Sequence, residues 1–269
     1  MMVFMEANVY KTDGSISGKL ELPKVFNLEY RDDLVRRAVL SEQSMRYQPQ
    51  GHYVLAGMQT TAVYVGKYEG YRRGRHMGQA IRPRQKLGGG AQGDVRRIPS
   101  AVKGKRAHPH MVEKKLKELI NRKEYLKALE SAIAGSAGQQ AIERHVISEK
   151  YMKLPIVVED GIEKISKTKE LYKILSALGV GDDMKRSHKP RKEDGLRRSS
   201  KARHFRKSAI IIVKEKAPVL MAGSNIPGVE VSALPDLTVE KLAPGGKPRL
   251  SIWSKGAIEG LEKELEKRR

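Results

Sequence analysis

Residues 207–213 read Lys207-Ser-Ala-Ile-Ile-Ile-Val213, and this run decides the class of fold. From Ala209 to Val213 every side chain is apolar, without alternation between apolar and polar residues. A strand with one face in solvent alternates, so this pattern predicts a strand that is covered on both faces. Such a strand belongs to a sheet that lies between two layers of helices.

Apolar patterns on both sides of this run predict the rest of the sheet and its helices. Strands are expected near 8–10, 154–158, 229–232 and 250–253, with a short helical turn at 218–223. Helices are expected near 31–45, 112–120, 122–136 and 167–178, and from about 254 onward. Because apolar strands alternate with helices, the sequence predicts an α/β fold, with a three-layer body whose mostly parallel sheet is flanked by helices.

Two pairs of neighbouring carboxylates stand out, Asp32 with Asp33 and Asp182 with Asp183. The first pair lies at an expected helix start and the second in an expected loop. Carboxylates in the first turn of a helix interact favourably with its dipole. We therefore interpret both pairs as capping groups rather than as catalytic acids.

The composition excludes several classes of protein. The 269 residues include 53 Lys and Arg against 31 Asp and Glu, which gives a formal net charge of +22. The absence of cysteine excludes disulfide frameworks, cysteine-ligated zinc, iron–sulfur clusters and thiol nucleophiles. No run of 18 apolar residues is present, and the amino terminus has no signal-peptide pattern. We therefore expect a soluble, intracellular protein, without a membrane segment, that binds a polyanion.

The positive charge is concentrated in two segments. The first basic segment, residues 46–110, has 13 basic and two acidic residues and 11 of the 25 glycines. The second basic segment, residues 185–207, has 11 basic and two acidic residues. The rest of the chain is almost neutral. We therefore expect a globular body, residues 1–45 and 111–269, with a long extended basic loop at 46–110 and a second basic loop at 185–207.

Sequence motifs of common catalytic sites are absent. Each Gly-Lys pair lacks the Ser or Thr of a P-loop, and there is no Gly-x-Ser-x-Gly or His-Glu-x-x-His motif. The run Gly88-Gly-Gly-Ala-Gln-Gly93 resembles a phosphate loop only in composition and is typical of a flexible turn. The histidines of the first basic segment have no cysteines or carboxylate cluster near them. We therefore expect no enzyme activity, no cofactor and no bound metal.

The first basic segment interleaves arginine with tyrosine and glycine, as in Tyr68-Glu-Gly-Tyr-Arg-Arg-Gly-Arg-His76. Nine of its 13 basic residues are arginine, whose guanidinium group binds two phosphate oxygens at once and stacks on exposed bases. Tyrosine offers a second stacking surface, and glycine allows the backbone to approach closely. This pattern favours binding of structured RNA; the alternative is a disordered segment that attracts any nucleic acid through its charge.

The run Arg72-Arg-Gly-Arg-His-Met-Gly-Gln-Ala-Ile-Arg-Pro-Arg-Gln-Lys-Leu-Gly-Gly-Gly-Ala-Gln-Gly93 resembles the long loop of the large-subunit ribosomal protein L four family, in its archaeal and eukaryotic type. The residues that follow, up to His110, resemble that loop too. Residues 207–213 and 242–254 are similar to two later signatures of the family. Because no long basic extension follows residue 269, the resemblance points to the archaeal type.

The resemblance implies a structural constituent of the large ribosomal subunit that binds large-subunit rRNA, supports its folding and assembly, and contacts neighbouring ribosomal proteins. The first basic segment would be an arm that helps line the nascent-peptide exit tunnel. The rRNA-binding residues implied for this arm are Arg46, Lys67, Arg72, Arg73, Arg75, His76, Arg82, Arg84, Lys86, Arg96, Arg97, Lys103, Lys105, Arg106, His108 and His110. The tip residues implied to lie near the nascent peptide are Arg73, Arg75, His76, Met77 and Gln79. Those implied in the second basic segment are Arg197, Arg198, Lys201, Arg203, Arg206 and Lys207.

Two alternatives come from other classes of protein. A free RNA-binding or RNA-chaperone protein would bind nucleic acid without a fixed structure, and its globular body would be dispensable for specificity. An RNA-modifying enzyme would need a cofactor-binding glycine turn on the α/β body, and the sequence has no such turn there.

Overall fold

The computed structural model of the chain describes residues 5–64, 78–86, 92–147, 154–189 and 205–269. Contacts within the chain divide it into two units. The large unit consists of residues 1–46 and 118–269, and the small unit of residues 47–117.

The large unit is built on a six-stranded sheet. In spatial order its strands are β2 (Ile16–Glu21), β1 (Glu6–Tyr10), β5 (Ile156–Val158), β8 (Ser251–Ser254), β6 (Ile210–Val213) and β7 (Glu230–Ala233). Strand β2 pairs antiparallel with β1, and every other neighbouring pair in the sheet is parallel. The prediction of an α/β body with a mostly parallel sheet is therefore confirmed.

The run that predicted this fold, β6, lies between β8 and β7 and is buried along its whole length. Its successive side chains enter two separate cores, because neighbouring residues of a strand point to opposite faces. Ile210 and Ile212 pack in one core with Trp253 of β8. Ile211 and Val213 pack in the other. A polar residue at any of these four positions would lose hydration on its face of the sheet.

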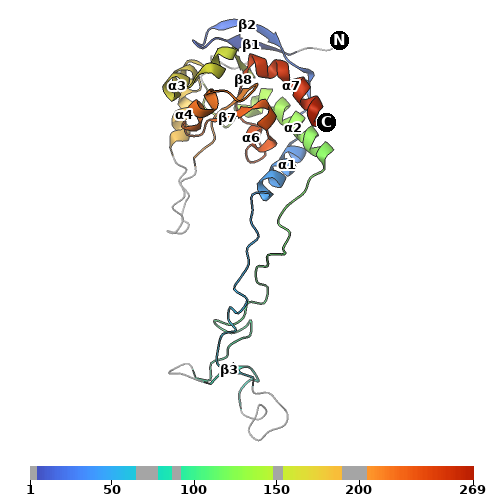
Figure 1. The fold of residues 1–269 in the computed structure, drawn as a ribbon, viewed down its shortest axis with the longest axis vertical. Helices are drawn as coiled ribbons and strands as arrows, with labels where there is room; N and C mark the ends of the chain where they lie inside the picture. Colours follow the sequence, from blue (N-terminus) through green and yellow to red (C-terminus); the bar gives the residue numbers. More distant parts are fainter. Residues whose placement is uncertain (1–4, 65–77, 87–91, 148–153, 190–204) are drawn as a thin grey trace. The chain divides into compact units, whose positions relative to one another are not determined.

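Helices cover both faces of the sheet (Figure 1). The face with Trp253 is covered by α1 (Asp32–Ser44), α2 (Arg122–Ala137), α6 (Val239–Leu242) and α7 (Lys255–Arg268). The other face is covered by α3 (Thr168–Ala177), α4 (Gly181–His188) and α5 (Val219–Ser224). Short 3-10 helices complete the unit: η1 (Lys24–Asn27), η2 (Gln139–Ala141), η4 (Asp160–Lys164) and η5 (Leu234–Asp236).

The small unit contains a two-stranded antiparallel sheet of β3 (Ala62–Val63) and β4 (Arg84–Gln85). An isolated antiparallel bridge joins Arg84 of β4 to Val95. The rest of its described residues form turns and extended chain.

The prediction of a helix at 112–120 is wrong, because Val112 and Glu113 lie in a turn and no regular secondary structure follows up to Ile120. Two residues of its predicted apolar stripe, Val112 and Leu119, are 60% and 79% exposed. Hydroxyl groups of α1 bind the backbone there instead. Ser41 Oγ donates to the Glu118 carbonyl at 2.6 Å, and the Glu118 N–H donates to Ser44 Oγ at 2.9 Å. In a helix over 112–120 the Glu118 N–H would donate to the Lys114 carbonyl, so its hydrogen bond to Ser44 takes the place of a helical one.

The second basic segment does not start as a loop, which corrects the boundary expected from charge. Lys185 to His188 form the last turn of α4. This turn is amphipathic, since Met184 and Ser187 are buried while Lys185 remains exposed. Cations in the last turn of a helix interact favourably with its dipole.

In the described part of the chain, no helix has both the length and the apolar character needed to cross a membrane.

The contact between α5 and β7 makes a prediction about packing. A Cβ atom on Gly223 would lie 2.2 Å from Cγ2 of Val231, and the valine is stiff about χ1. We expect Gly223→Ala to destabilise the protein by about 1–2 kcal/mol, because overpacking outweighs the gain in helix propensity. In a Val231→Ala background the same change should be neutral or stabilising. Urea unfolding of the four proteins measures both effects.

Gly260→Ala in α7 is the matched control, since its Cβ atom would meet Leu234 Cδ2 at an ordinary 3.6 Å. It should be neutral or slightly stabilising. Equal losses for Gly223→Ala with and without Val231 would contradict the close contact.

Candidate nucleic-acid interface

Three arginines of the small unit bind its own backbone. Arg84 donates to the carbonyl oxygens of Gly93 and Ala80, at 3.0 and 3.1 Å. Arg96 donates to the Val102 carbonyl at 2.7 Å, and its side chain also contacts Asp94 at 3.2 Å. A third, Arg97, donates to the Ala62 carbonyl at 3.4 Å. These guanidinium groups hold turns of the small unit together, which fixes the positions of the cations between them.

A second group of cations in the small unit is exposed and unpaired. Within the residues that the structure describes, no hydrogen bond or ion pair engages their charged groups, so their charge is free to meet an external anion. The members of this group are Arg82, Lys86, Lys103, Lys105 and Arg106. Gln79, His108 and His110 are also exposed. The carbonyl of His110 accepts a hydrogen bond from His52 Nδ1 at 2.9 Å, which joins two extended stretches of the unit.

Exposed tyrosines accompany these cations. Tyr47, Tyr53 and Tyr64 are each about 60% exposed. Exposed aromatic rings and arginine planes are the surfaces on which unpaired RNA bases stack. The sequence argument was based on Tyr68 and Tyr71 and did not include these three, although the same interleaving of tyrosine with basic residues continues around them.

Ten of the expected site residues lie outside the described residues. They are Lys67, Arg72, Arg73, Arg75, His76, Met77, Arg197, Arg198, Lys201 and Arg203.

Arg46, expected in the arm, belongs to the large unit. Its guanidinium group forms an ion pair with Glu240 of α6, and Nη1 donates to Oε1 at 3.2 Å. This pairing ties the end of α1 to α6, so part of the charge of Arg46 is already neutralised within the protein.

The described ends of the second basic segment converge on Gly228, just before β7. The hydroxyl of Ser187 donates to the Pro227 carbonyl at 2.7 Å. At Gly228 φ is +80°, and a Cβ atom there would lie 2.5 Å from the Arg206 carbonyl oxygen and 2.6 Å from Ser187 Cβ. Only glycine suits this conformation and this space. The position of the segment's two ends is therefore set by the large unit.

Arg249 is the centre of a buried polar network at the same edge of the sheet, and only 1% of its surface is exposed. Nη1 contacts Oε2 of Glu230 at 2.5 Å. Nη2 donates to the carbonyl oxygens of Ala209 and Gly228, at 3.0 and 2.8 Å, and Nε donates to that of Ser208. Burial lowers the pKa of Arg249, and Glu230 counteracts this by stabilising its charge. One side chain thus joins the amino ends of β6, β7 and β8.

Asp183 is fully buried beside this network. Oδ1 accepts from Val146 N–H and from Arg186 Nε, at 3.0 and 2.8 Å. Oδ2 accepts from Ser208 Oγ at 2.5 Å and from His145 Nδ1 at 2.9 Å. Burial by itself raises the pKa of Asp183, but the hydrogen bonds from His145, Arg186 and Ser208 outweigh it and hold the pKa well below its usual range.

These contacts correct the interpretation of the Asp182 and Asp183 pair. Both residues lie in the first turn of α4, in a helix and not in a loop. Asp182 is exposed and pairs with Lys185 at 2.9 Å, whereas Asp183 connects α4 to the residues before β6 and to His145. The sequence has no local signal for this role, because its partners are up to 38 residues away.

At the carboxyl ends of β5 and β8, carboxylates of the protein itself accept hydrogen bonds from the start of α7 and the end of β8. Asp160 Oδ1 accepts from the Gly256 N–H at 2.7 Å, in the first turn of α7. Glu163 Oε1 accepts from Ser254 Oγ at 2.7 Å. In open α/β sheets this edge is where nucleotide cofactors usually bind, with phosphate at a helix amino terminus. Here an internal carboxylate takes the place of a phosphate. Among the described residues, no group of three or more His, Asp or Glu side chains could hold a metal ion.

The chain is similar to ribosomal proteins along almost its whole length. A model of the ribosomal protein L4/L1 family matches residues 20–264. Large ribosomal subunit protein uL4 of Methanocaldococcus jannaschii is 37% identical over 267 residues, which cover 97% of this chain and all of the relative. The uL4 protein of Methanococcus vannielii is 40% identical over 266 residues, with the same coverage. That of Archaeoglobus fulgidus is 37% identical over 262 residues, covering 96% of this chain and 98% of the relative.

The network around Asp183 makes a prediction about stability and pH. Its folded pKa lies below the unfolded value of about 3.9, so its stabilising contribution is fully present above about pH 4 and is lost as the pH falls through the folded pKa. We expect Asp183→Asn to lower the free energy of unfolding at pH 7 by about 3–5 kcal/mol, because buried donors lose a charged acceptor. Because the variant has no carboxylate at position 183 to protonate, its free energy of unfolding should decrease less than that of the unaltered protein as the pH falls below 4.

Urea unfolding at pH 7 and across pH 2–5 measures both effects. Asp182→Asn is the matched control. Its carboxylate pairs only at the surface, so its effect should stay within about 0.5 kcal/mol. Equal effects of the two variants would show that burial of Asp183 has been misjudged.

Proposed function

The chain belongs to the ribosomal protein L4/L1 family, and on this basis we propose that it is a structural constituent of the large ribosomal subunit that binds large-subunit rRNA. The family match is the observation that carries this proposal, because it spans both basic segments as well as the sheet strands β5 to β8. The protein acts in the cytoplasm within the assembled subunit, where it contacts rRNA and neighbouring ribosomal proteins. In this proposal its role is structural and not catalytic.

The distribution of charge supports different roles for the globular body and for the first basic segment. The globular body, residues 1–45 and 111–269, docks on the subunit, and the first basic segment extends into rRNA. The unpaired cations Arg82, Lys86, Lys105 and Arg106 neutralise phosphates and so supply most of the binding free energy. Arg84, Arg96 and Arg97 donate hydrogen bonds to backbone carbonyls of the same segment, and so hold its turns in the conformation that binds RNA.

Residues Arg73, Arg75, His76, Met77 and Gln79 form the tip of the arm in this proposal and line the exit tunnel near the nascent peptide. The resemblance of residues 72–110 to the family's long loop supports this assignment. The second basic segment binds rRNA close to the large unit, and the described ends at Ser187 and Arg206 give it a fixed anchorage.

Sedimentation of a native cell extract through a high-salt sucrose gradient tests the proposal. We expect the chain to remain with the large subunit after the salt wash, because an interlocked protein is retained when surface electrostatics are screened. Recovery at the top of the gradient would instead favour a free RNA chaperone.

Charge reversal in the arm should weaken binding to large-subunit rRNA. We expect Lys105→Glu with Arg106→Glu to lower the affinity more than about tenfold at ~0.1 M salt. The double variant should also reduce the log–log salt slope by about 1.4–1.8, since each lost phosphate contact removes roughly 0.7–0.9. Filter binding across a salt series measures both quantities.

Lys169→Glu with Lys173→Glu, exposed on α3, makes the same change in net charge away from both basic segments. Its affinity and slope should stay close to those of the unaltered protein. If the two double variants weaken binding equally, net charge alone governs binding and the arm has no special part in it.

A further inference from the structure

A cavity of about 310 Å³ lies at the amino ends of β6 and β8, beside the described end of the second basic segment. Six lysine and arginine side chains and one histidine line it, and no carboxylate does. We call it the cationic cleft. Its lining also includes Phe205 and the prolines Pro244 and Pro248.

Half of these cations form ion pairs within the protein, and they share two carboxylates. Arg186 pairs with Asp183, and both Lys207 and Arg249 pair with Glu230. Arg144, Arg206 and Lys247 are different, because all three are exposed and their charged groups form no hydrogen bond or ion pair with another described residue. Three positive charges therefore face the same cavity without an internal counter-charge.

The turn that carries Lys247 is rigid. Gly245 and Gly246 have φ angles of +73° and +78°. The Gly246 N–H donates to the Ala243 carbonyl at 2.9 Å, and the hydroxyl of Tyr30 donates to the Gly246 carbonyl at 3.0 Å. On the far side of the turn, Arg249 is buried. The backbone position from which the Lys247 side chain extends is therefore fixed by these contacts.

Phe205 adds an apolar surface beside these charges, and 47% of it is exposed. An exposed phenyl ring next to unpaired cations suits a ligand that has both a flat ring and a negative charge. A nucleotide has both. RNA-binding proteins commonly bind unpaired bases by stacking them on aromatic rings, while basic groups hold the phosphates.

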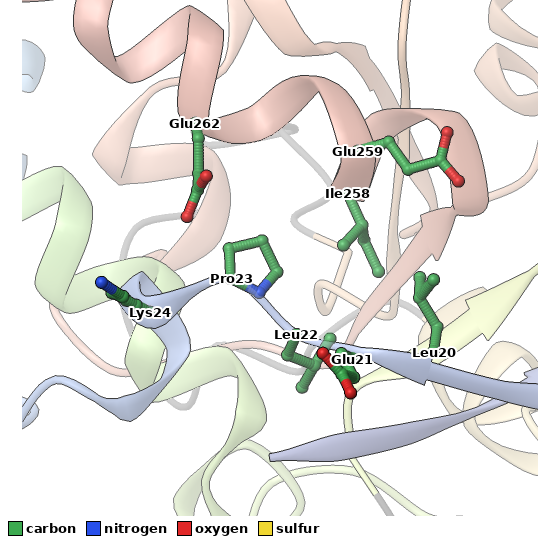
Figure 2. A pocket seen from close by; sticks show the side chains of 8 residues that line it. All are labelled: Leu20, Glu21, Leu22, Pro23, Lys24, Ile258, Glu259 and Glu262. Atoms are coloured by element: carbon green, nitrogen blue, oxygen red, sulfur yellow. The ribbon is translucent and has the colours of Figure 1, made fainter. Parts of the chain in front are cut away.

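Another pocket of the large unit has the opposite character. Figure 2 shows it between the end of β2 and α7. Its volume is about 250 Å³. Glu21, Glu259 and Glu262 line it, together with Lys24 as the one basic residue. Phosphate would be repelled there. The anion-binding character of the cationic cleft is thus a local property and not a consequence of the net charge of the chain.

We propose that the cationic cleft binds one unpaired nucleotide of an RNA strand, with its phosphate among Arg144, Arg206 and Lys247 and its base against Phe205. This inference rests on the proposed function, since it assigns part of the rRNA contact to this cleft. The cavity volume is at the lower end of the ~300–1,000 Å³ of small-ligand pockets, which suits a single nucleotide. A base within a double helix is stacked and could not reach Phe205.

Photo-crosslinking of the full chain tests this assignment. The probe is a single-stranded ten-nucleotide RNA that contains 4-thiouridine, and the crosslinked peptides are mapped by mass spectrometry. We expect a crosslink at Phe205 or its immediate neighbours. Its yield should fall about fivefold or more in Arg144→Glu with Lys247→Glu, while Lys169→Glu with Lys173→Glu should leave it unchanged. Both pairs are exposed, so thermal unfolding should be the same for both variants.

Competition identifies the occupant. Unlabelled single-stranded RNA should abolish the crosslink, whereas a ten-base-pair RNA duplex and uridine monophosphate at equal phosphate concentration should not. Effective competition by the duplex would overturn the single-stranded assignment, and competition by uridine monophosphate would make the cleft a site for free nucleotides. Crosslinks confined to residues 46–110 would also overturn it, yet would leave the proposed rRNA binding intact. Failure to sediment with the large subunit would instead reject the proposed function itself.

Discussion

The buried charge of Arg249 is the constraint on which the edge of the large unit depends. A guanidinium group removed from water is costly unless every donor has a partner and the charge is balanced. Here Glu230 balances the charge, and carbonyl oxygens of Ser208, Ala209 and Gly228 accept from its donors. These partners come from the chain just before β6 and β7, and Arg249 itself precedes β8. The three strand starts must therefore keep their relative positions, since any shift would leave a buried donor unsatisfied.

That constraint also determines where the second basic segment is attached. Ser187 and Arg206 meet across Gly228, and Asp183 binds Ser208 directly. Buried polar groups that are fully satisfied specify one arrangement, because the alternatives lose hydrogen bonds in a low-dielectric surrounding. The two apolar cores bury the hydrophobic side chains of the large unit, and this network adds the requirement that the chain segments it joins keep one relative position. It places the cationic cleft and the segment's ends at the same edge of the sheet.

The cations of this protein have two different tasks. Arg84, Arg96 and Arg97 bind backbone carbonyls, and Arg249 binds carbonyls and a carboxylate, so these groups shape the protein. Lys105, Arg106, Lys247 and others have no internal partner among the described residues and are available to phosphate. Arginine suits the first task because its rigid planar fork directs several donors at once. A count of basic residues cannot separate the two groups, and the separation decides which substitutions should affect the fold and which should affect RNA binding.

The sequence by itself determined the class of fold, because the all-apolar run of β6 and the amphipathic helices are local patterns that record burial. The positions of both basic segments were also evident from the sequence, as were the runs that resemble the family. Tertiary structure decided what depends on partners distant in sequence. The expected helix at 112–120 is absent, and the Glu118 N–H that it would use donates to Ser44 of α1 instead. Asp183 is a buried acceptor for groups from three parts of the chain, and the cationic cleft joins Arg144, Phe205 and Lys247. Such sites are invisible to local pattern, since their chemistry arises only when folding brings distant side chains within a few ångströms of each other.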